Sequence, residues 1–109
     1  MMDQVFRALA HSMRREMLDI VKKDPGCSLL HVCNHFDVSR IAVMKHLKIL
    51  EEADLIVSRK QGRTRALYIN VAPIQMIYDR WTTEYSGYFA SRLTSLKYKL
   101  EKDSQVEGD

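Results

Sequence analysis

Seven basic side chains are concentrated in the middle of this 109-residue chain. Residues 39–68 hold seven Lys or Arg against three acids, whereas residues 1–38 are balanced and residues 69–109 carry one more acid than base. The seven cations are Arg40, Lys45, Lys48, Arg59, Lys60, Arg63 and Arg65. Localised positive charge is typical of surfaces that bind nucleic-acid phosphates and base edges. We therefore expect nucleic-acid recognition to be the chemistry of this chain.

A helix predicted over residues 39–52 carries the first three cations. Its N-cap is Ser39, and its inward apolar positions are Ala42, Val43, Leu47 and Leu50. The side chains left facing outward near its N-terminus are Ser39, Arg40, Ile41, Met44, Lys45 and Lys48. Arg and Lys can donate to guanine, Ile and Met can contact a thymine methyl, and a Ser hydroxyl at a helix N-terminus can hold a phosphate. This pattern predicts a recognition helix.

Three shorter helices are expected before it. The first covers residues 4–10, the second is capped by Ser12 and ends at Asp24-Pro25-Gly26, and the third is capped by Ser28. Two short helices separated by a tight turn, here the third helix and the recognition helix, form a helix-turn-helix.

The remaining four cations lie on a predicted β-hairpin over residues 57–69. Val57, Leu67 and Ile69 are its inward candidates, and Gly62 can supply the positive φ of its turn. Four like charges on one hairpin repel each other unless an anion, such as DNA phosphate, relieves them. For Arg65, pairing with an acid of the same subunit stays open. The predicted fold class is mainly α with a small β-hairpin wing, a winged helix-turn-helix.

A long C-terminal helix is predicted over residues 73–100, because Pro73 suits a first turn and apolar residues recur at helical spacing up to Leu100. Such a helix exceeds what so small a domain can cover, so its apolar surface predicts burial against a second subunit. We expect residues 1–100 to form one domain that includes this dimerisation helix. Residues 101–109 are mostly polar and are expected to be a disordered tail.

The sequence from Phe6 to about Asn70 resembles the ArsR/SmtB family of bacterial winged-helix repressors. The matching pieces are ALAHSMRR at 8–15, SRIAVMKHLKILEEADL at 39–55 and RKQGR at 59–63. The segment IYDRW at 77–81 resembles a branch often encoded beside START-like (SRPBCC) proteins. Asp54 stands where the family usually has Gly, and Asp is one of the few other residues that tolerate the left-handed conformation.

The resemblance implies a homodimer that is joined through its first and last helices. Such dimers bind an inverted repeat in a promoter and leave it on receiving a signal. We therefore expect a transcriptional repressor that binds double-stranded DNA sequence-specifically. The expected interface residues are Phe6, Ile77, Trp81, Tyr85, Tyr88, Phe89 and Leu96.

The family's usual metal-binding positions lack ligands in this chain. Ser28 and Leu30 occupy the places of a Cys-x-Cys pair, and Trp81 stands where the last-helix site has a His. We therefore expect no metal and no cofactor. An alternative stays open, in which the repressor responds to metal through Cys27, His31 and His35, which are spaced i, i+4, i+8, or to thiol oxidation at Cys33.

Other function classes have weaker support in the sequence. A winged helix used only for protein interaction would have a neutral recognition helix and wing. No Gly-rich phosphate loop, carboxylate pair or Ser/His/Asp set indicates an enzyme. No 18-residue apolar run and no secretion signal are visible, so a cytoplasmic location without membrane contact is expected. An unidentified small-molecule inducer also stays open.

Overall fold

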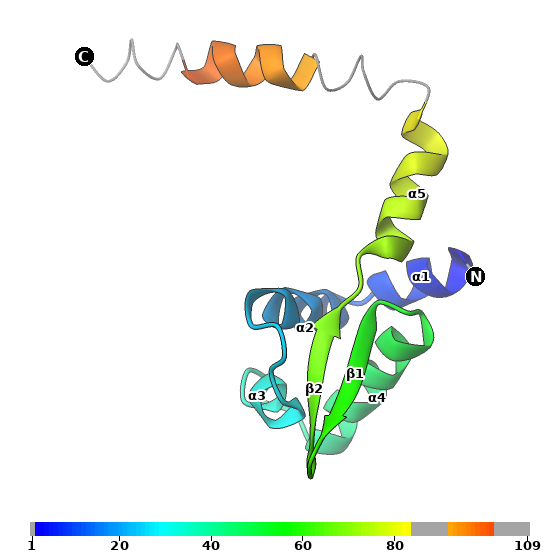
Figure 1. The fold of residues 1–109 in the computed structure, drawn as a ribbon, viewed down its shortest axis with the longest axis vertical. Coiled ribbons are helices and arrows are strands. Elements are labelled where there is room, and N and C mark those ends of the chain that lie inside the picture. The colour runs from blue at the N-terminus through cyan, green and yellow to red at the C-terminus, as the bar shows by residue number, and fades with distance from the viewer. Residues whose placement is uncertain (1, 84–91, 102–109) are drawn as a thin grey trace. The chain divides into compact units, whose positions relative to one another are not determined.

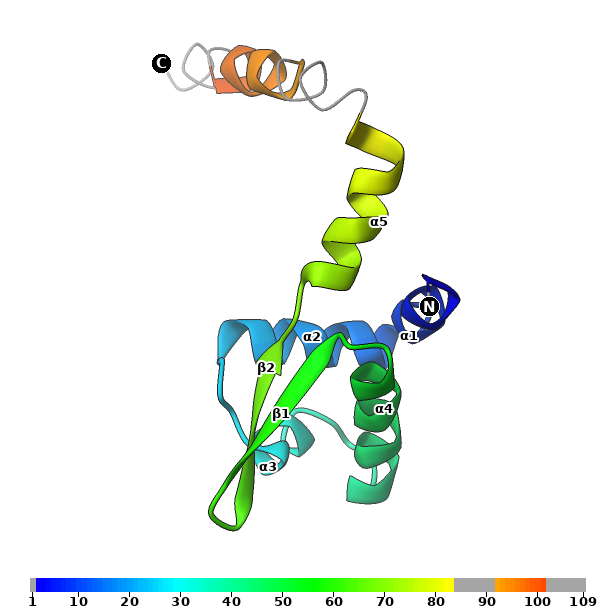
Figure 2. The same cartoon turned by 45° about the vertical axis from the view of Figure 1, so that its right-hand side comes forward.

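The computed structural model describes residues 2–83 and 92–101. Its elements are α1 (Met2–Leu9), α2 (Ser12–Lys23), α3 (Leu29–Cys33), α4 (Arg40–Glu52), β1 (Ile56–Gln61), β2 (Thr64–Ile69) and α5 (Ala72–Thr82), and residues 92–101 are also helical (Figure 1). The chain divides into two compact units, Met1–Met76 and Ile77–Asp109. In the first unit the hairpin lies beside α2 and α4, with its tip projecting past α3 in both views (Figures 1 and 2). This is the predicted winged helix-turn-helix.

Side-chain caps start the two helices of the helix-turn-helix. Ser28 Oγ accepts from the N–H of His31 at 3.1 Å, and Ser39 Oγ accepts from the N–H of Ala42 at 3.1 Å, as predicted. The prediction that Ser12 caps α2 is wrong. His11 has the extended cap conformation, and its Nδ1 accepts from Met13 N–H at 3.1 Å, so Ser12 is the first helical residue.

The end of α4 is a tight left-handed turn at Asp54, whose φ is 59°. The Asp54 N–H donates to Glu51 O at 3.0 Å and the Leu55 N–H donates to Leu50 O at 2.9 Å, the paired bonds of a Schellman motif. Asn70 Nδ2 donates to the Asp54 carbonyl at 2.9 Å. The C-terminal end of the recognition helix therefore lies just before the first strand of the hairpin and is hydrogen-bonded to the residue that follows the second strand.

The hairpin pairs Ile56 with Ile69 at its base and Gln61 with Thr64 at its tip. Gly62, with φ of 62°, opens the two-residue loop, as a type II′ turn requires. The prediction that Val57 faces inward is wrong, because its side chain is 44% exposed. Strand alternation instead places the preceding residue, Ile56, in the core.

The core lies between the helices and the hairpin. Its fully buried larger side chains are Met17, Val21, Val32, Val43, Leu50, Leu55, Ile56 and Leu67. Leu67 also forms a β-bridge with Cys27, with Leu67 N–H donating to Cys27 O at 2.9 Å and Gly26 N–H donating to Leu67 O at 2.7 Å. This bridge fixes the second wing strand to the segment that leads into α3.

Arg14 is the one charged side chain buried among the described residues, and it is 8% exposed. Its Nε donates to Ala8 O at 2.8 Å and its Nη2 donates to Arg7 O at 2.9 Å. Both carbonyls belong to the last turn of α1, where intrahelical donors are lacking. The third nitrogen, Nη1, lies 3.1 Å from His46 Nδ1 on α4. One guanidinium on α2 thus joins α1 to the recognition helix.

The protonation state of His46 follows from this contact. A guanidinium can only donate, so His46 Nδ1 must accept and the neutral ring carries its proton on Nε2. The His11 ring lies against it, with 4.6 Å between centroids. Partial burial lowers the pKa of His46 below its ordinary value, and the charges of His11 and Arg14 lower it further.

The C-terminal helix is only partly described. α5 begins at Ala72, one residue before the predicted start, and none of its side chains is buried. Residues 84–91 and 102–109 lie outside the described residues, so the continuity of a helix over 73–100 and the state of most of the tail stay predictions. No helix of the described residues is long and apolar enough to cross a membrane.

Arg14→Ala is expected to lower the free energy of unfolding by at least about 2 kcal/mol, because it removes the buried guanidinium that donates to Ala8 O, Arg7 O and His46 Nδ1, and only Arg7 O keeps another donor, the Ala10 N–H. Urea denaturation at a fixed protein concentration measures this change. Arg7→Ala, which removes an exposed side chain, is the control, and its effect should stay within about 0.5 kcal/mol. A loss for Arg14→Ala no larger than the control would contradict the role assigned to this guanidinium.

Acid is expected to destabilise the fold through His46. Its pKa in the folded chain lies below the ordinary value of 6.5, so the unfolded chain takes up the proton first as pH falls. The contribution of His46 is therefore fully present above about pH 6.5 and is lost as pH falls through the folded pKa. The difference in unfolding free energy between pH 7.5 and 5.0 should be smaller in His46→Gln than in the original chain. Equal differences would refute this assignment.

Candidate nucleic-acid interface

The outward face of α4 is the first half of the candidate site. All six predicted residues are exposed: Ser39, Arg40, Ile41, Met44, Lys45 and Lys48. Ile41 is 66% exposed and Met44 is 48% exposed, which is unusual for large apolar side chains unless a partner covers them. The predicted inward residues Val43, Leu47 and Leu50 are buried and Ala42 is half-buried. One face of α4 is thus buried in the core, and the opposite face is exposed and carries cations and apolar side chains.

Ser39 has a double role at the N-terminus of α4. Its hydroxyl oxygen accepts from the Ala42 N–H, which leaves the hydroxyl proton able to donate outward. Together with the first-turn N–H groups, which have no intrahelical carbonyl acceptor, this donor suits an anion.

The wing is the second half of the candidate site. Its four cations, Arg59, Lys60, Arg63 and Arg65, are all exposed. Lys60 and Arg65 are cross-strand partners, so two like charges lie opposite each other. Strand alternation places Arg59 on the hairpin face opposite Leu67. Its guanidinium carbon lies 6.0 Å from the centre of the Tyr68 ring. Within residues 2–83 and 92–101, none of the α4 or wing cations has an acidic partner within 4.0 Å.

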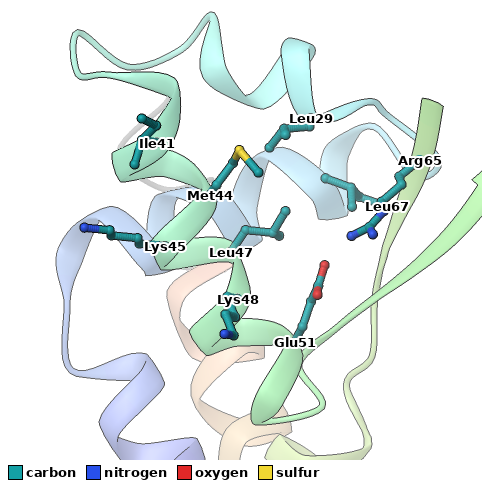
Figure 3. A pocket seen from close by; sticks show the side chains of 9 residues that line it. All are labelled: Leu29, Ile41, Met44, Lys45, Leu47, Lys48, Glu51, Arg65 and Leu67. Atoms are coloured by element: carbon teal, nitrogen blue, oxygen red, sulfur yellow. The ribbon is translucent and has the colours of Figure 1, made fainter. Parts of the chain in front are cut away.

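A groove separates α4 from the wing (Figure 3). It has a volume of about 470 Å³ and is lined by Leu29, Ile41, Met44, Lys45, Leu47, Lys48, Glu51, Arg65 and Leu67. Five of these residues were predicted for the interface. Glu51 was not, although its position seven residues after Met44 and three after Lys48 places it on the same helical stripe. The charge of Glu51 therefore belongs to this surface.

The alternative metal site does not assemble. Cys27 precedes the cap of α3 and bridges to Leu67, and His35 lies beyond the end of α3, so the expected helical alignment with His31 is absent. His31 Nε2 instead lies 3.0 Å from Asp24 Oδ2, and His35 Nδ1 lies 2.9 Å from His31 O. In the described part of the chain, no group of three or more His, Cys, Asp or Glu side chains could hold a metal ion.

The Cys27 thiol is not activated by its surroundings. Burial raises the pKa of the Cys27 thiol above its ordinary value, and the nearby Asp24 carboxylate raises it further. The thiol form is therefore favoured, whereas the nucleophile in thiol chemistry is the thiolate. Cys33 is half-buried.

The predicted interface residues that the structure describes retain exposed surface. Phe6 on α1 is 45% exposed, Trp81 on α5 is 59% exposed and Leu96 is 52% exposed, while Ile77 is half-buried. The Arg80 guanidinium lies 5.9 Å from the centre of the Trp81 ring. The other three predicted residues, Tyr85, Tyr88 and Phe89, lie outside the described residues.

Comparisons with known proteins agree with this architecture. A family model described as a helix-turn-helix domain matches residues 9–59. The HTH-type transcriptional regulator YuzN of Bacillus subtilis strain 168 is 33% identical over 85 residues, which cover 72% of this chain and 92% of the relative. The transcriptional repressor SdpR of the same strain is 28% identical over 74 residues, covering 68% of this chain and 81% of the relative.

A solved structure extends the likeness over most of the chain. An ArsR-like transcriptional regulator from Rhodococcus sp. RHA1 is 27% identical, with a TM-score of 0.67, and the match covers 92% of this chain and 90% of that one. The fold, the exposed cations of α4 and the wing, and these relatives all lead to one assignment. The chain belongs to the ArsR/SmtB family of winged helix-turn-helix transcriptional regulators, which bind DNA and are not enzymes.

Proposed function

We propose that the chain is a homodimeric repressor that binds an inverted repeat in a promoter, with α4 in the major groove and the wing against the backbone or minor groove. The observation that carries this proposal is the placement of charge: all the excess positive charge of the chain lies on α4 and the hairpin, exposed and without acidic partners in the described residues. Likeness to the repressor SdpR supports the direction of regulation.

The N-terminal half of α4 is the proposed base-reading element. Arg40 and Lys45 would donate to guanine O6 and N7, while Ile41 and Met44 would contact thymine methyls. Ser39 would hold a phosphate with its hydroxyl and the adjoining helix N-terminus. These roles suit side chains that are exposed and whose helix is fixed on its other face by the core.

The wing and Lys48 are the proposed phosphate-binding elements. Arg59, Lys60 and Arg63 lie on the strands and tip of the hairpin, where their mutual repulsion is relieved by a polyanion. Each such contact releases condensed counterions from the DNA, so affinity should fall steeply with salt. Arg65 carries a charge on the same hairpin, and its position toward α4 distinguishes it from the other three.

Two copies of the chain would associate through α1 and α5. The exposed fractions of Phe6 and Trp81 provide apolar surface on these two helices. A two-fold symmetric dimer presents two recognition helices related by the same axis, which is why an inverted repeat is the matching DNA target.

The test is a fluorescence-anisotropy titration with the DNA upstream of the chain's own gene and with a scrambled duplex, each at several salt concentrations. Selective binding with a steep salt dependence is expected. Weak and equal binding to both duplexes would reject the proposal in favour of a protein-interaction role. A working titration also allows metals, thiol oxidants and small apolar molecules to be screened for release of the DNA.

Base and phosphate contacts should respond differently to substitution. Arg40→Ala is expected to cost about 1–3 kcal/mol on the selected duplex and much less on the scrambled one. Arg63→Ala should weaken both duplexes about equally and lower the salt slope by about one. Lys22→Ala, which removes an exposed cation from α2, is the control and should change neither quantity. Equal losses on both duplexes for Arg40→Ala would show that Arg40 does not read bases.

Trp81→Ala is expected to weaken the dimer by about 2 kcal/mol, roughly 30-fold in dissociation constant, because a large aromatic anchor is lost. Sedimentation equilibrium measures this, and half-saturation of DNA should move to higher protein concentration. Met76→Ala removes an exposed apolar side chain of α5 outside the Ile77–Trp81 stripe and is the control. A stable, fully active Trp81→Ala dimer would remove α5 from the proposed interface.

A further inference from the structure

One carboxylate oxygen in the groove between α4 and the wing is buried without a hydrogen-bond partner. It is Oε1 of Glu51, in the last turn of α4, and within the described residues it is the one such buried side-chain polar atom. Leaving a buried carboxylate oxygen unpaired is costly, so this atom requires a donor that can reach it.

Arg65 on β2 is the cation of the wing that faces Glu51. It lies on the same strand face as Leu67, two residues along, which is fully buried at the floor of the groove. Figure 3 shows the guanidinium of Arg65 and the carboxylate of Glu51 pointing toward each other from opposite walls of the groove. The two groups lie more than 4.0 Å apart, since they form no ion pair at that limit.

Lys48 is the competing partner for Glu51. It lines the same groove three residues earlier on α4, a spacing at which helical side chains meet. Arg65 is the better partner on two grounds. Its planar guanidinium can donate two parallel hydrogen bonds to one carboxylate, whereas a lysine offers a point charge. Arg65 also faces like charge from Lys60 across the hairpin, which pairing with an anion relieves.

We propose that Arg65 and Glu51 close into an ion pair across the groove when the chain binds DNA, and that this pair sets the distance between the recognition helix and the wing. Arg65 is then a positioning residue rather than a phosphate contact. The inference rests on the proposed DNA-binding function. It gives Glu51, an acid beside a DNA-binding surface, a role that favours binding despite its charge.

The sign of the Glu51→Gln effect tests the proposal. An acid near DNA repels phosphates, so its removal alone should tighten binding. If Glu51 instead positions the wing, Glu51→Gln should weaken binding to the selected duplex by roughly tenfold, a typical size for a coupled pair. Glu52→Gln is the matched control, because it removes the same charge from the next residue, which does not line the groove. That control should bind as tightly as the original chain or more tightly.

Salt dependence and charge reversal separate positioning from phosphate contact. Arg65→Gln should weaken binding with an unchanged salt slope, whereas Arg63→Gln should lower that slope by about one. The double variant Glu51→Arg with Arg65→Glu should regain affinity to within about threefold of the original chain, since the pair is restored with reversed polarity. Lys48→Gln combined with Glu51→Gln should show additive losses.

Three results would overturn the proposal: tighter binding by Glu51→Gln, a salt slope lowered by about one in Arg65→Gln, or no recovery in the charge-reversed double variant. If the original chain binds neither duplex, the proposed function fails on its own. A double-mutant cycle on DNA affinity tests the pair directly, with coupling between Glu51 and Arg65 expected to exceed that between Glu51 and Lys48. Equal couplings would reject it.

Discussion

The three hydrogen bonds of the buried Arg14 guanidinium hold the helical part of the fold together. Short helices leave their last carbonyls without donors, and α1, which spans Met2–Leu9, is too short to be stable in isolation. Arg14 supplies donors to two of those carbonyls, and Arg15 supplies another to Leu9 O at 2.6 Å. Because the same guanidinium also contacts His46, it fixes the position of α4 relative to the end of α1.

Features set by neighbouring residues could be predicted from the sequence. Ser28 and Ser39 cap their helices because a hydroxyl reaches an N–H two or three residues on, whatever the rest of the chain does. The positive φ of Asp54 and Gly62 could be predicted because Asp and Gly are among the few residue types that adopt it at low cost. The exposed face of α4 followed from helical spacing alone. These inferences needed no knowledge of tertiary contacts.

Features set by distant residues could not be predicted in this way. The cap of α2 is His11, one residue before the predicted Ser12. The inward face of β1 begins at Ile56, one residue before the predicted Val57. Local preferences do not resolve a difference of one position. The contact of Arg14 with His46 spans thirty-two positions in the chain, and the placement of Arg65 across the groove from Glu51 depends on how the wing folds back. Both arrangements depend on tertiary packing, and both involve charged side chains that position the recognition helix or line its groove.

The place of the chain's single tryptophan gives it a built-in optical reporter. Indole emission moves to shorter wavelength when water is excluded from the ring, and Trp81 is 59% exposed in the isolated chain. Its fluorescence therefore reports what covers α5, without any label or added chromophore. Excitation at the red edge of the absorption band, where tyrosine does not absorb, isolates the signal of this one helix.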